Sequence, residues 1–360
     1  HNIFTATLAL NLTYLTSTYQ SKGLSGMEIN KTVSRGSLCH SRRVLEDITN
    51  SELLSSHRRK KSKKAPSTAI PDSTHDSREV SHTTNDTRLY MQREPHNIDA
   101  ADADDIRCCT DYVSKIYTFF RESEGASMVD PTYMDNQEFI TPYMRAVLVN
   151  WLVDVHLKFR MLPETLYITV NIIDRYLEKC QVRASKLQLV GVSALLLASK
   201  YEEIYPPKSS DLVPITAHTF SVDEILRMEQ KIAQALDYNF TVPTIITFLY
   251  RFVKAAHGNK TLIQLSCYLA ERSLQEYSTL KFPPSLIAAT VVHAARMELY
   301  KNAWSPTLVA YTKYDESDLE ECGATMREYM AHPPSTSEDA VFRKYSGSKL
   351  GKVSLMSITI

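Results

Sequence analysis

The sequence predicts an all-α protein in which two helical bundles follow a long disordered tail. From Asp111 onward, apolar residues recur at helical spacings, and start and stop signals lie at nearly every boundary. No comparable run alternates with the period of two that a half-buried strand requires. Residues 21–111 contain one aromatic residue, Tyr90, and are rich in Ser, Thr, Lys, Arg and Asp, so this stretch cannot bury enough surface to offset its ordering entropy.

The composition fits an intracellular protein. The 360 residues are 43% apolar, which is enough to fill the cores of two domains of ordinary size. Residues 1–100 carry 14 Lys and Arg against 10 Asp and Glu, a mild excess that excludes a strongly basic DNA-coating protein. The six cysteines form no Cys-x-x-Cys pair, which favours free thiols over a disulfide framework or a zinc site.

Residues 1–20 are uncharged but are not expected to form a signal peptide or a membrane span. They lack a basic first region and a small-residue cleavage motif, and they contain too many Thr and Asn to cross a bilayer. The chain does not begin with Met, which suggests a fragment or an uncertain gene start.

Capping signals divide the first bundle into helices. Thr141-Pro142 opens a helix over 142–159, Pro163-Glu164 opens a second, and Ser185 opens a third that ends before Pro206-Pro207. A capping box, formed by Ser221 and Glu224, then precedes an apolar stripe at spacings of three and four, which consists of Ile225, Met228, Ile232 and Leu236.

The helical pattern then occurs a second time. The segments "TLYITVNIIDRYL" and "SKLQLVGVSALLLASK" are followed later by "TLIQLSCYLAERSL" and "PSLIAATVVHAARM" at similar separations, and Val242-Pro243 lies between the two sets. Residues 187–199 contain no charge and several small residues. A helix that is apolar on all sides must be surrounded by other helices, so we expect it at the centre of the first bundle.

The predicted helix 142–159 has more apolar residues than one face can hold. Either it is fully buried, or part of its surface is exposed for a partner. Arg145 lies among these apolar residues and needs an anionic partner if it is buried, for which Asp174 is the obvious candidate.

No catalytic constellation is found. The sequence lacks a glycine-rich phosphate loop, His-Glu-x-x-His, Gly-x-Ser-x-Gly and a Cys/His cluster. We therefore expect neither an enzyme nor a protein that holds a metal or a cofactor.

The segments "MRAVLVNWLVDV", "NIIDRYL", "KLQLVG", "LLLASKYEEIYPP" and "LRMEQKI", in this order, resemble the mitotic cyclins. The later "FPPSLIAA" and "KYSGSKLGKVSL" are more similar to the B-type than to the A-type. The resemblance runs from about residue 110 to 352 and implies a regulatory subunit of a cyclin-dependent kinase with two five-helix cyclin boxes. It divides the chain into a disordered tail (1–106), an amino-terminal helix (107–126), box 1 (135–241), box 2 (242–333) and a carboxy-terminal tail (334–360).

The resemblance implies a kinase-binding site. Lys200 and Glu229 match the polar pair that holds the kinase at its mobile helix, and the surrounding apolar contacts match Tyr201, Leu236, Tyr238 and Phe240. From spacing alone, a solvated helix end is the less favoured alternative for the polar pair. Tyr112 and Ile116 match a second kinase contact, with core packing as the alternative. Arg145 and Asp174 match the family's buried structural ion pair.

A docking surface for substrates and inhibitors with an Arg-x-Leu motif is also implied. The residues that match its apolar stripe are Met144, Val147, Leu148 and Trp151. Gln188 would hydrogen-bond the backbone of the bound peptide, and Asp154 would pair with its arginine. Such a stripe is more often core, so only the resemblance favours docking. Asn150 stands where the family usually has aspartate and Val147 where it usually has isoleucine, two departures that bear on the affinity of the surface.

The tail carries a motif similar to the destruction box of mitotic cyclins, which the anaphase-promoting ubiquitin ligase reads. Its residues are Arg42, Leu45, Ile48 and Asn50. A degron must be accessible, which suits a tail without a core. Residues 57–64, "HRRKKSKK", offer lysines for ubiquitin and resemble a nuclear localisation signal, although a solvated charge run is an equal alternative. Nucleus and cytoplasm are the expected locations.

The expected function is that of a G2/mitotic B-type cyclin, which activates a cyclin-dependent kinase until ubiquitin-dependent degradation. One alternative is a two-box transcription adaptor, which needs a basic DNA-facing surface and usually a zinc ribbon; neither is found here. The other is an inert helical scaffold, which would not need the motif at 42–50. We expect no nucleic-acid or membrane partner.

Overall fold

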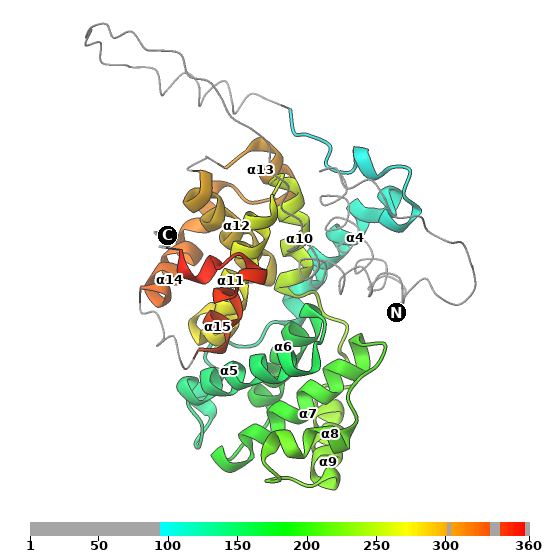
Figure 1. Ribbon diagram of the computed structural model, residues 1–360, viewed down its shortest axis with the longest axis vertical. Coiled ribbons are helices and arrows are strands. Elements are labelled where there is room, and N and C mark those ends of the chain that lie inside the picture. Colours follow the sequence, from blue (N-terminus) through cyan, green and yellow to red (C-terminus); the bar gives the residue numbers. More distant parts are fainter. Residues whose placement is uncertain (1–93, 301–303, 332–338, 357–360) are drawn as a thin grey trace, which may run out of the picture.

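The computed structural model describes residues 94–300, 304–331 and 339–356, and within these ranges it is helical with no strand. The helices form two bundles, one above the other in Figure 1. The first contains α5 (Pro142–Phe159), α6 (Pro163–Lys179), α7 (Ala184–Glu202), α8 (Ser209–Leu212) and α9 (Val222–Ala235). The second contains α10 (Ile245–Ala255), α11 (Lys260–Gln275), α12 (Pro284–Tyr300), α13 (Pro306–Thr312) and α14 (Glu320–Met330). Two helices flank them, α4 (Thr110–Ser123) and α15 (Ala340–Ser346).

Helix α7 is the centre of the first bundle, as its uncharged sequence predicts. It packs against α5, α6 and α9, and nearly every side chain from Leu187 to Ser199 is buried. Gly191 lets α5 approach closely, because a Cβ built there would lie 2.6 Å from Leu148 Cδ1. In the second bundle, α10, α11 and α12 pack against one another in the same way. The fold class predicted from the sequence is therefore confirmed.

The predicted start signals are confirmed for three helices of the first bundle, α5, α6 and α9. Thr141 Oγ1 accepts a hydrogen bond from Met144 N (3.3 Å) at the start of α5, and Ser221 and Glu224 form the expected capping box of α9. Helix α7 starts slightly earlier than predicted. Its N-cap is Arg183 rather than Ser185, because Lys186 N already donates to Arg183 O (2.8 Å).

The ordered chain begins before residue 107, which corrects the predicted extent of the disordered tail. Residues 94–108 contain two short 3-10 turns, and Asp99 pairs there with Arg251 (2.5 Å) and Lys254 (2.7 Å) of α10. Helix α4 then docks on the second bundle, where Tyr117 donates a hydrogen bond to Thr247 O (3.2 Å). This amino-terminal segment is thus part of the folded body.

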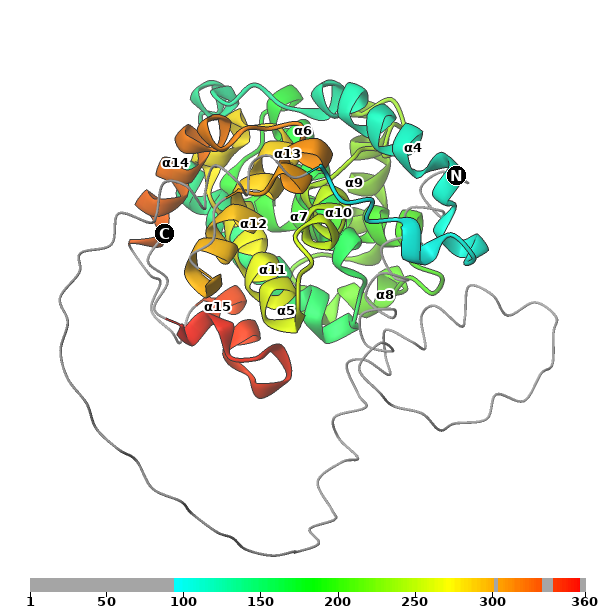
Figure 2. The same ribbon diagram turned by 90° about the horizontal axis from the view of Figure 1, so that it is seen from above.

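The carboxy-terminal segment also folds. Helix α15, red in Figure 1, lies at the junction of the bundles and packs against α5 and α11, and Figure 2 shows the same neighbours from above. Glu271 of α11 accepts hydrogen bonds from Lys344 (2.6 Å) and from the buried Tyr345 (2.7 Å). Asp339 caps α15 and pairs with the buried Arg272. Among the described helices, none is long and apolar enough to span a bilayer.

Candidate functional site

Lys200 and Glu229 form an ion pair on the surface of the first bundle. Lys200 lies in the last turn of α7 and Glu229 in the middle of α9, and Lys200 Nζ is 2.7 Å from Glu229 Oε1 and 2.8 Å from Oε2. The Lys200 side chain is 45% exposed, whereas that of Glu229 is only 13% exposed. The pair therefore fixes the lysine in one place while leaving it open to a partner.

Large apolar side chains lie exposed on the segments that leave these two helices. Ile204 and Tyr205 follow α7, and Tyr238 follows α9. The chain turns sharply at Asp237 and Tyr238, whose φ angles of 51° and 57° are in the left-handed region that costs free energy for residues with a Cβ. An exposed apolar group beside a fixed charge pair is typical of a protein-binding surface.

Two further aromatic residues lie between this surface and the core of the first bundle. The half-buried Tyr201 and Phe240 rings meet nearly edge to face, with centroids 6.3 Å apart, and the Tyr201 hydroxyl lies 2.6 Å from Thr241 Oγ1. Leu236, in contrast, is 1% exposed and belongs to the core of the first bundle. The prediction of a direct contact for Leu236 is thus corrected, because its side chain cannot reach a partner without unpacking the core.

Glu203 anchors the end of α7. Its Oε1 accepts hydrogen bonds from Leu162 N (2.6 Å) and Thr165 Oγ1 (2.7 Å) at the start of α6, whose own N-cap residue offers no side-chain acceptor. A carboxylate at a helix N-terminus also interacts favourably with the helix dipole. The anchor lies three residues after Lys200, so it limits movement of the proposed contact surface.

Near Glu203, the carboxyl groups of Glu164 and Glu202 have raised pKa values. Burial, and to a lesser extent Glu202, raises the pKa of Glu164 to about 8, although the hydrogen bond from Thr247 Oγ1 (3.0 Å) acts in the opposite direction. Burial and the nearby Glu203 raise the pKa of Glu202 to about 7.

The α4 residues divide between two roles. Tyr112 is exposed, as is Phe119 seven residues later on the same face. Ile116 is half-buried and packs against the large core that includes the second bundle. Tyr112 is thus available for a partner, whereas core packing, the alternative weighed for Ile116, agrees with its position.

The exposed surface of α5 is narrower than its sequence suggests. Val147 is 50% exposed, and Met144, Trp151 and the neighbouring Gln188 of α7 are half-buried. Leu148 is only 5% exposed and lies against Gly191, so its assignment to the docking surface is corrected. The α5 surface, as we use the term below, consists of Met144, Val147, Trp151, Asp154 and Gln188.

The polar groups of α5 have partners within the chain. Asn150 Oδ1 accepts hydrogen bonds from Ala340 N (2.7 Å) and Gln275 Nε2 (3.1 Å), which ties α5 to α15 and α11. Asp154, predicted to meet the arginine of a peptide, is paired with Arg343 of α15, with Asp154 Oδ2 2.7 Å from Arg343 Nη2.

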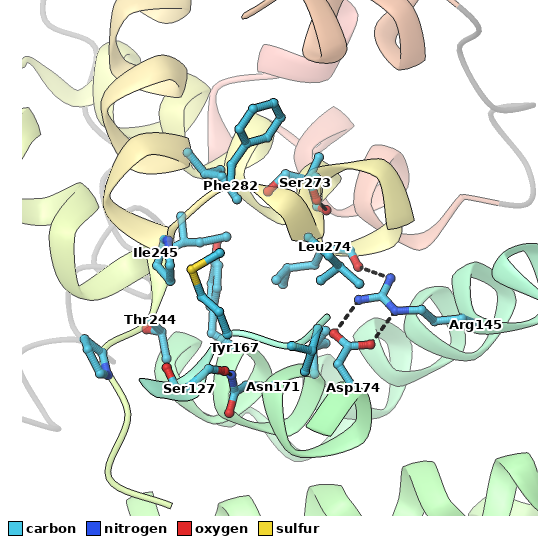
Figure 3. Close-up of a pocket in the computed structure, with 18 residues that line it drawn as sticks. Ser127, Arg145, Tyr167, Asn171, Asp174, Thr244, Ile245, Ser273, Leu274 and Phe282 are labelled. Atoms are coloured by element: carbon cyan, nitrogen blue, oxygen red, sulfur yellow. Dashed lines mark hydrogen bonds and ion pairs between the residues drawn. The ribbon is translucent and has the colours of Figure 1, made fainter. Parts of the chain in front are cut away.

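Arg145 and Asp174 form the predicted buried pair. Arg145 Nε is 2.5 Å from Asp174 Oδ1 and Nη2 is 2.7 Å from Oδ2, while Nη1 donates to Leu274 O (3.0 Å) in the second bundle, as Figure 3 shows. Tyr133 donates to the same carboxylate (2.9 Å). Burial alone would lower the pKa of Arg145, but Asp174 raises it above its usual value, so the guanidinium stays charged.

A small cavity lies beside this pair. It lies between the bundles and has a volume of about 90 Å3, with Tyr167, Ile245 and Phe282 among the residues that line it. Sites for small-molecule ligands usually measure about 300–1,000 Å3.

Comparison with known proteins decides the family. The N-terminal domain of cyclins matches residues 115–241, and the C-terminal domain of cyclins matches residues 243–359. Together these two matches cover most of the chain. The chain belongs to the cyclin family.

The cyclin's relatives are of the B-type, as the sequence predicted. The chain is 43% identical over 256 residues to Cyclin-B2-1 of Oryza sativa subsp. japonica, a match that covers 71% of this chain and 61% of the relative. It is 37% identical over 289 residues to the G2/mitotic-specific cyclin-B of Dictyostelium discoideum, covering 78% and 66%, respectively. The cyclin therefore spans less than two thirds of the length of these curated relatives.

A solved structure shares the fold. The yeast RNA Pol II CTD kinase CTDK-1 complex matches with a TM-score of 0.50 and 15% identity, covering 59% of this cyclin and 73% of that chain. The two tandem cyclin boxes predicted from the sequence correspond to the two bundles, so that helices α5–α9 form box 1 and helices α10–α14 form box 2.

Some residues of the cyclin's surfaces were missed by sequence reasoning. Ile204 and Tyr205 stand in the quoted "LLLASKYEEIYPP" segment, and two apolar residues directly before a Pro-Pro stop were the signal that could have identified them. No local signal pointed to Arg343. The destruction-box residues Arg42, Leu45, Ile48 and Asn50, and the basic run at 57–64, lie outside the described residues.

Proposed function

We propose that this B-type cyclin binds a cyclin-dependent kinase through the surface around Lys200 and Glu229 and thereby switches the kinase on at the G2/M transition. The observation that carries the proposal is the fixed ion pair bordered by exposed Ile204, Tyr205 and Tyr238. Membership of the cyclin family and the G2/mitotic names of its relatives support it.

The mechanism requires no catalytic group in the cyclin. A kinase is active only when its mobile helix is turned inward, so that a glutamate on it pairs with the lysine that orients ATP. A partner that binds only this inward state shifts the kinase population towards it by its difference in affinity for the two states. Because Glu203 and the Lys200–Glu229 pair hold the surface in shape, little binding free energy is spent on ordering it.

Two further activities belong to the proposal. The α5 surface recruits substrates and inhibitors that carry Arg-x-Leu, because an apolar stripe that ends at a carboxylate complements a leucine and an arginine two residues apart. The motif at Arg42, Leu45, Ile48 and Asn50 directs the cyclin to the anaphase-promoting ubiquitin ligase, which ends kinase activity. We place the protein in the nucleus and cytoplasm.

A reconstituted kinase assay tests the proposal. The 360-residue cyclin is titrated into a purified mitotic cyclin-dependent kinase with histone as the substrate, and activity should depend on both subunits. The Lys200→Ala, Glu229→Ala double variant should need well over tenfold more cyclin for half-maximal activation, equivalent to about 1.4 kcal/mol or more of binding free energy.

The same two helices offer a matched control. Lys186 and Glu224 also form an exposed ion pair between α7 and α9, at the other end of α7 (3.1 Å). The Lys186→Ala, Glu224→Gln variant removes that pair while keeping an acceptor for the capping box. Equal activation by the two double variants, or wild-type activation by the Lys200 variant, would contradict the proposed surface.

A further inference from the structure

The α5 surface ends in a carboxylate that lies on the same helical face as its apolar residues. Val147, Trp151 and Asp154 stand at positions i, i+4 and i+7 of one helix, so their side chains follow one another along α5. The Asp154 side chain is 50% exposed. A ligand that lies along this face meets two apolar groups first and a negative charge at the end.

Arg343 already occupies this carboxylate. Its Nη2 lies 2.7 Å from Asp154 Oδ2, and its side chain remains 40% exposed. The two residues are 189 positions apart in the sequence, so only the folding of α15 onto α5 brings them together.

The helix that carries Arg343 is firmly held. Ala340 N donates to Asn150 of α5, and the buried Tyr345 donates to Glu271 of α11. Lys344 pairs with the same glutamate. Arg343 thus lies between two anchored positions, and pairing with Asp154 costs it less conformational entropy than it would cost a side chain on a mobile arm.

We propose that Arg343 is a built-in competitor for the arginine of Arg-x-Leu ligands and makes the α5 surface of this cyclin select mainly for the leucine. This inference rests on the proposed docking function. An incoming arginine must either displace Arg343 from Asp154 or share the carboxylate with it, and sharing places two positive charges side by side. Either way, the arginine of the ligand gains less than it would from a free carboxylate, whereas the apolar contacts with Val147 and Trp151 are unaffected.

The expected size of the effect follows from the exposure of the pair. Exposed ion pairs contribute little, so removal of Arg343 should strengthen the binding of an arginine-containing ligand by about two- to fivefold. The gain should shrink as the salt concentration is raised from about 0.05 to 0.5 M, because the interaction is screened.

Peptide binding to the 360-residue cyclin tests the inference. Two fluorescent ten-residue peptides differ only in that one carries Arg-x-Leu and the other citrulline-x-Leu, which keeps the shape of arginine without its charge. Their dissociation constants are measured by anisotropy with wild-type cyclin and with Arg343→Gln. The control variant is Lys349→Gln, which removes the same charge from an exposed position of the same segment that lies outside the Asp154 pair.

Arg343→Gln should tighten binding of the arginine peptide about two- to fivefold and leave the citrulline peptide unchanged, while Lys349→Gln should change the ratio of the two affinities far less. In the Arg343→Gln, Asp154→Asn double variant, the advantage of arginine over citrulline should disappear. Suppose that wild type binds both peptides. If Arg343→Gln then leaves the ratio of the two dissociation constants unchanged, or changes it no more than Lys349→Gln does, Arg343 does not compete with the arginine of the ligand. Failure of wild type and of both single variants to bind either peptide would instead refute the docking function itself.

Discussion

At the residue scale, adjacent side chains on one helix take different roles. Val147 of α5 is 50% exposed, whereas Leu148, its neighbour, is 5% exposed and fits against Gly191. Trp151 and Asp154, which the sequence also assigns to the docking surface, differ in exposure as well. Trp151 is half-buried and Asp154 is exposed. Burial therefore decides which substitutions report on docking and which report on folding.

Replacement of Trp151 by Ala should weaken docking selectively. We expect KM for a substrate with Arg-x-Leu to rise about tenfold relative to KM for the same substrate without the motif, because the largest apolar contact of the α5 surface is lost. Steady-state kinetics of the kinase complex measures this ratio. Val147→Ser, at a more exposed position, should shift the ratio in the same direction with less effect on stability, and an unchanged ratio for both variants would show that this surface does not dock substrates.

The buried carboxyl of Glu164 predicts how stability depends on pH. Its pKa is about 8 in the folded protein against 4.5 normally, so between these values the folded state binds more protons than the unfolded state. Stability should therefore fall as pH rises from about 5 to 8. Glu164→Gln removes the contribution of Glu164 to this dependence and should be more stable than wild type by about 2 kcal/mol or more at pH 8, with a difference that shrinks towards pH 5.

Urea unfolding at several pH values measures the effect of Glu164→Gln. Glu122→Gln, at an exposed carboxylate on α4, serves as the control and should leave the pH dependence of wild type in place. A Glu164→Gln variant that loses stability by the same amount at every pH would indicate a packing defect instead of the ionisation of a buried acid.

At the residue scale, the sequence predicts the partner of a side chain when burial would leave that side chain with an uncompensated charge. Arg145 sits among apolar residues, and the cost of an unpaired buried guanidinium pointed to Asp174. The sequence does not separate core from surface on a helix that is apolar all round, so Leu148 was assigned to a partner surface although it is core. Leu236 was assigned to one from the resemblance alone, although it ends the apolar stripe of the amphipathic α9 and is also core. The Asp154–Arg343 pair depends on tertiary packing over 189 positions and leaves no local pattern.

At the scale of elements, caps and stop residues define helices well because they satisfy the unpaired backbone groups at helix ends locally. Helix α6 is an exception, since its cap comes from Glu203, which is distant in the sequence. Helix α15 was predicted as part of a tail because a seven-residue helix has little periodicity, and its stability derives from contacts with α5 and α11.

Glu203 follows α7 and caps the start of α6, so loss of its side chain should loosen the end of α7. We expect Glu203→Ala to destabilise the protein by about 1–3 kcal/mol, because two hydrogen-bond donors lose a charged acceptor. The urea midpoint at pH 7 measures this change. Glu202→Ala is the matched control, and it should cost less or even stabilise, because it removes a carboxyl whose pKa burial raises to about 7. Equal destabilisation by the two substitutions would argue against the capping role of Glu203.

At the scale of the whole molecule, the two cyclin boxes are joined by polar contacts as well as by apolar packing. Arg145 of box 1 donates to Leu274 O of box 2, and α15 bridges α5 and α11. The repeated pattern in the sequence predicts two boxes of similar plan. It does not predict how they join, since that depends on side chains such as Asn150 of α5, which accepts hydrogen bonds from α11 and α15 at once.

The folded body and the amino-terminal motif should be separable in function. We expect Arg42→Ala with Leu45→Ala to lengthen the lifetime of the cyclin after metaphase without altering the folded boxes, because these residues precede the described body. A chase of the protein through anaphase in synchronised cells measures the half-life. Ser41→Ala with Val44→Ala is the matched control within the same segment, and a wild-type half-life for the Arg42 variant would mean that the motif is not read.

The most direct test of the central claim is hydrogen exchange of the 360-residue cyclin with and without the kinase. We expect kinase binding to slow exchange in the segments that follow α7 and α9, residues 203–208 and 236–241, which border the Lys200–Glu229 pair. The segment 347–352 beyond α15 should exchange at the same rate in both states. Protection confined to that segment, or none at either segment beside the ion pair, would contradict the claim that this surface holds the kinase.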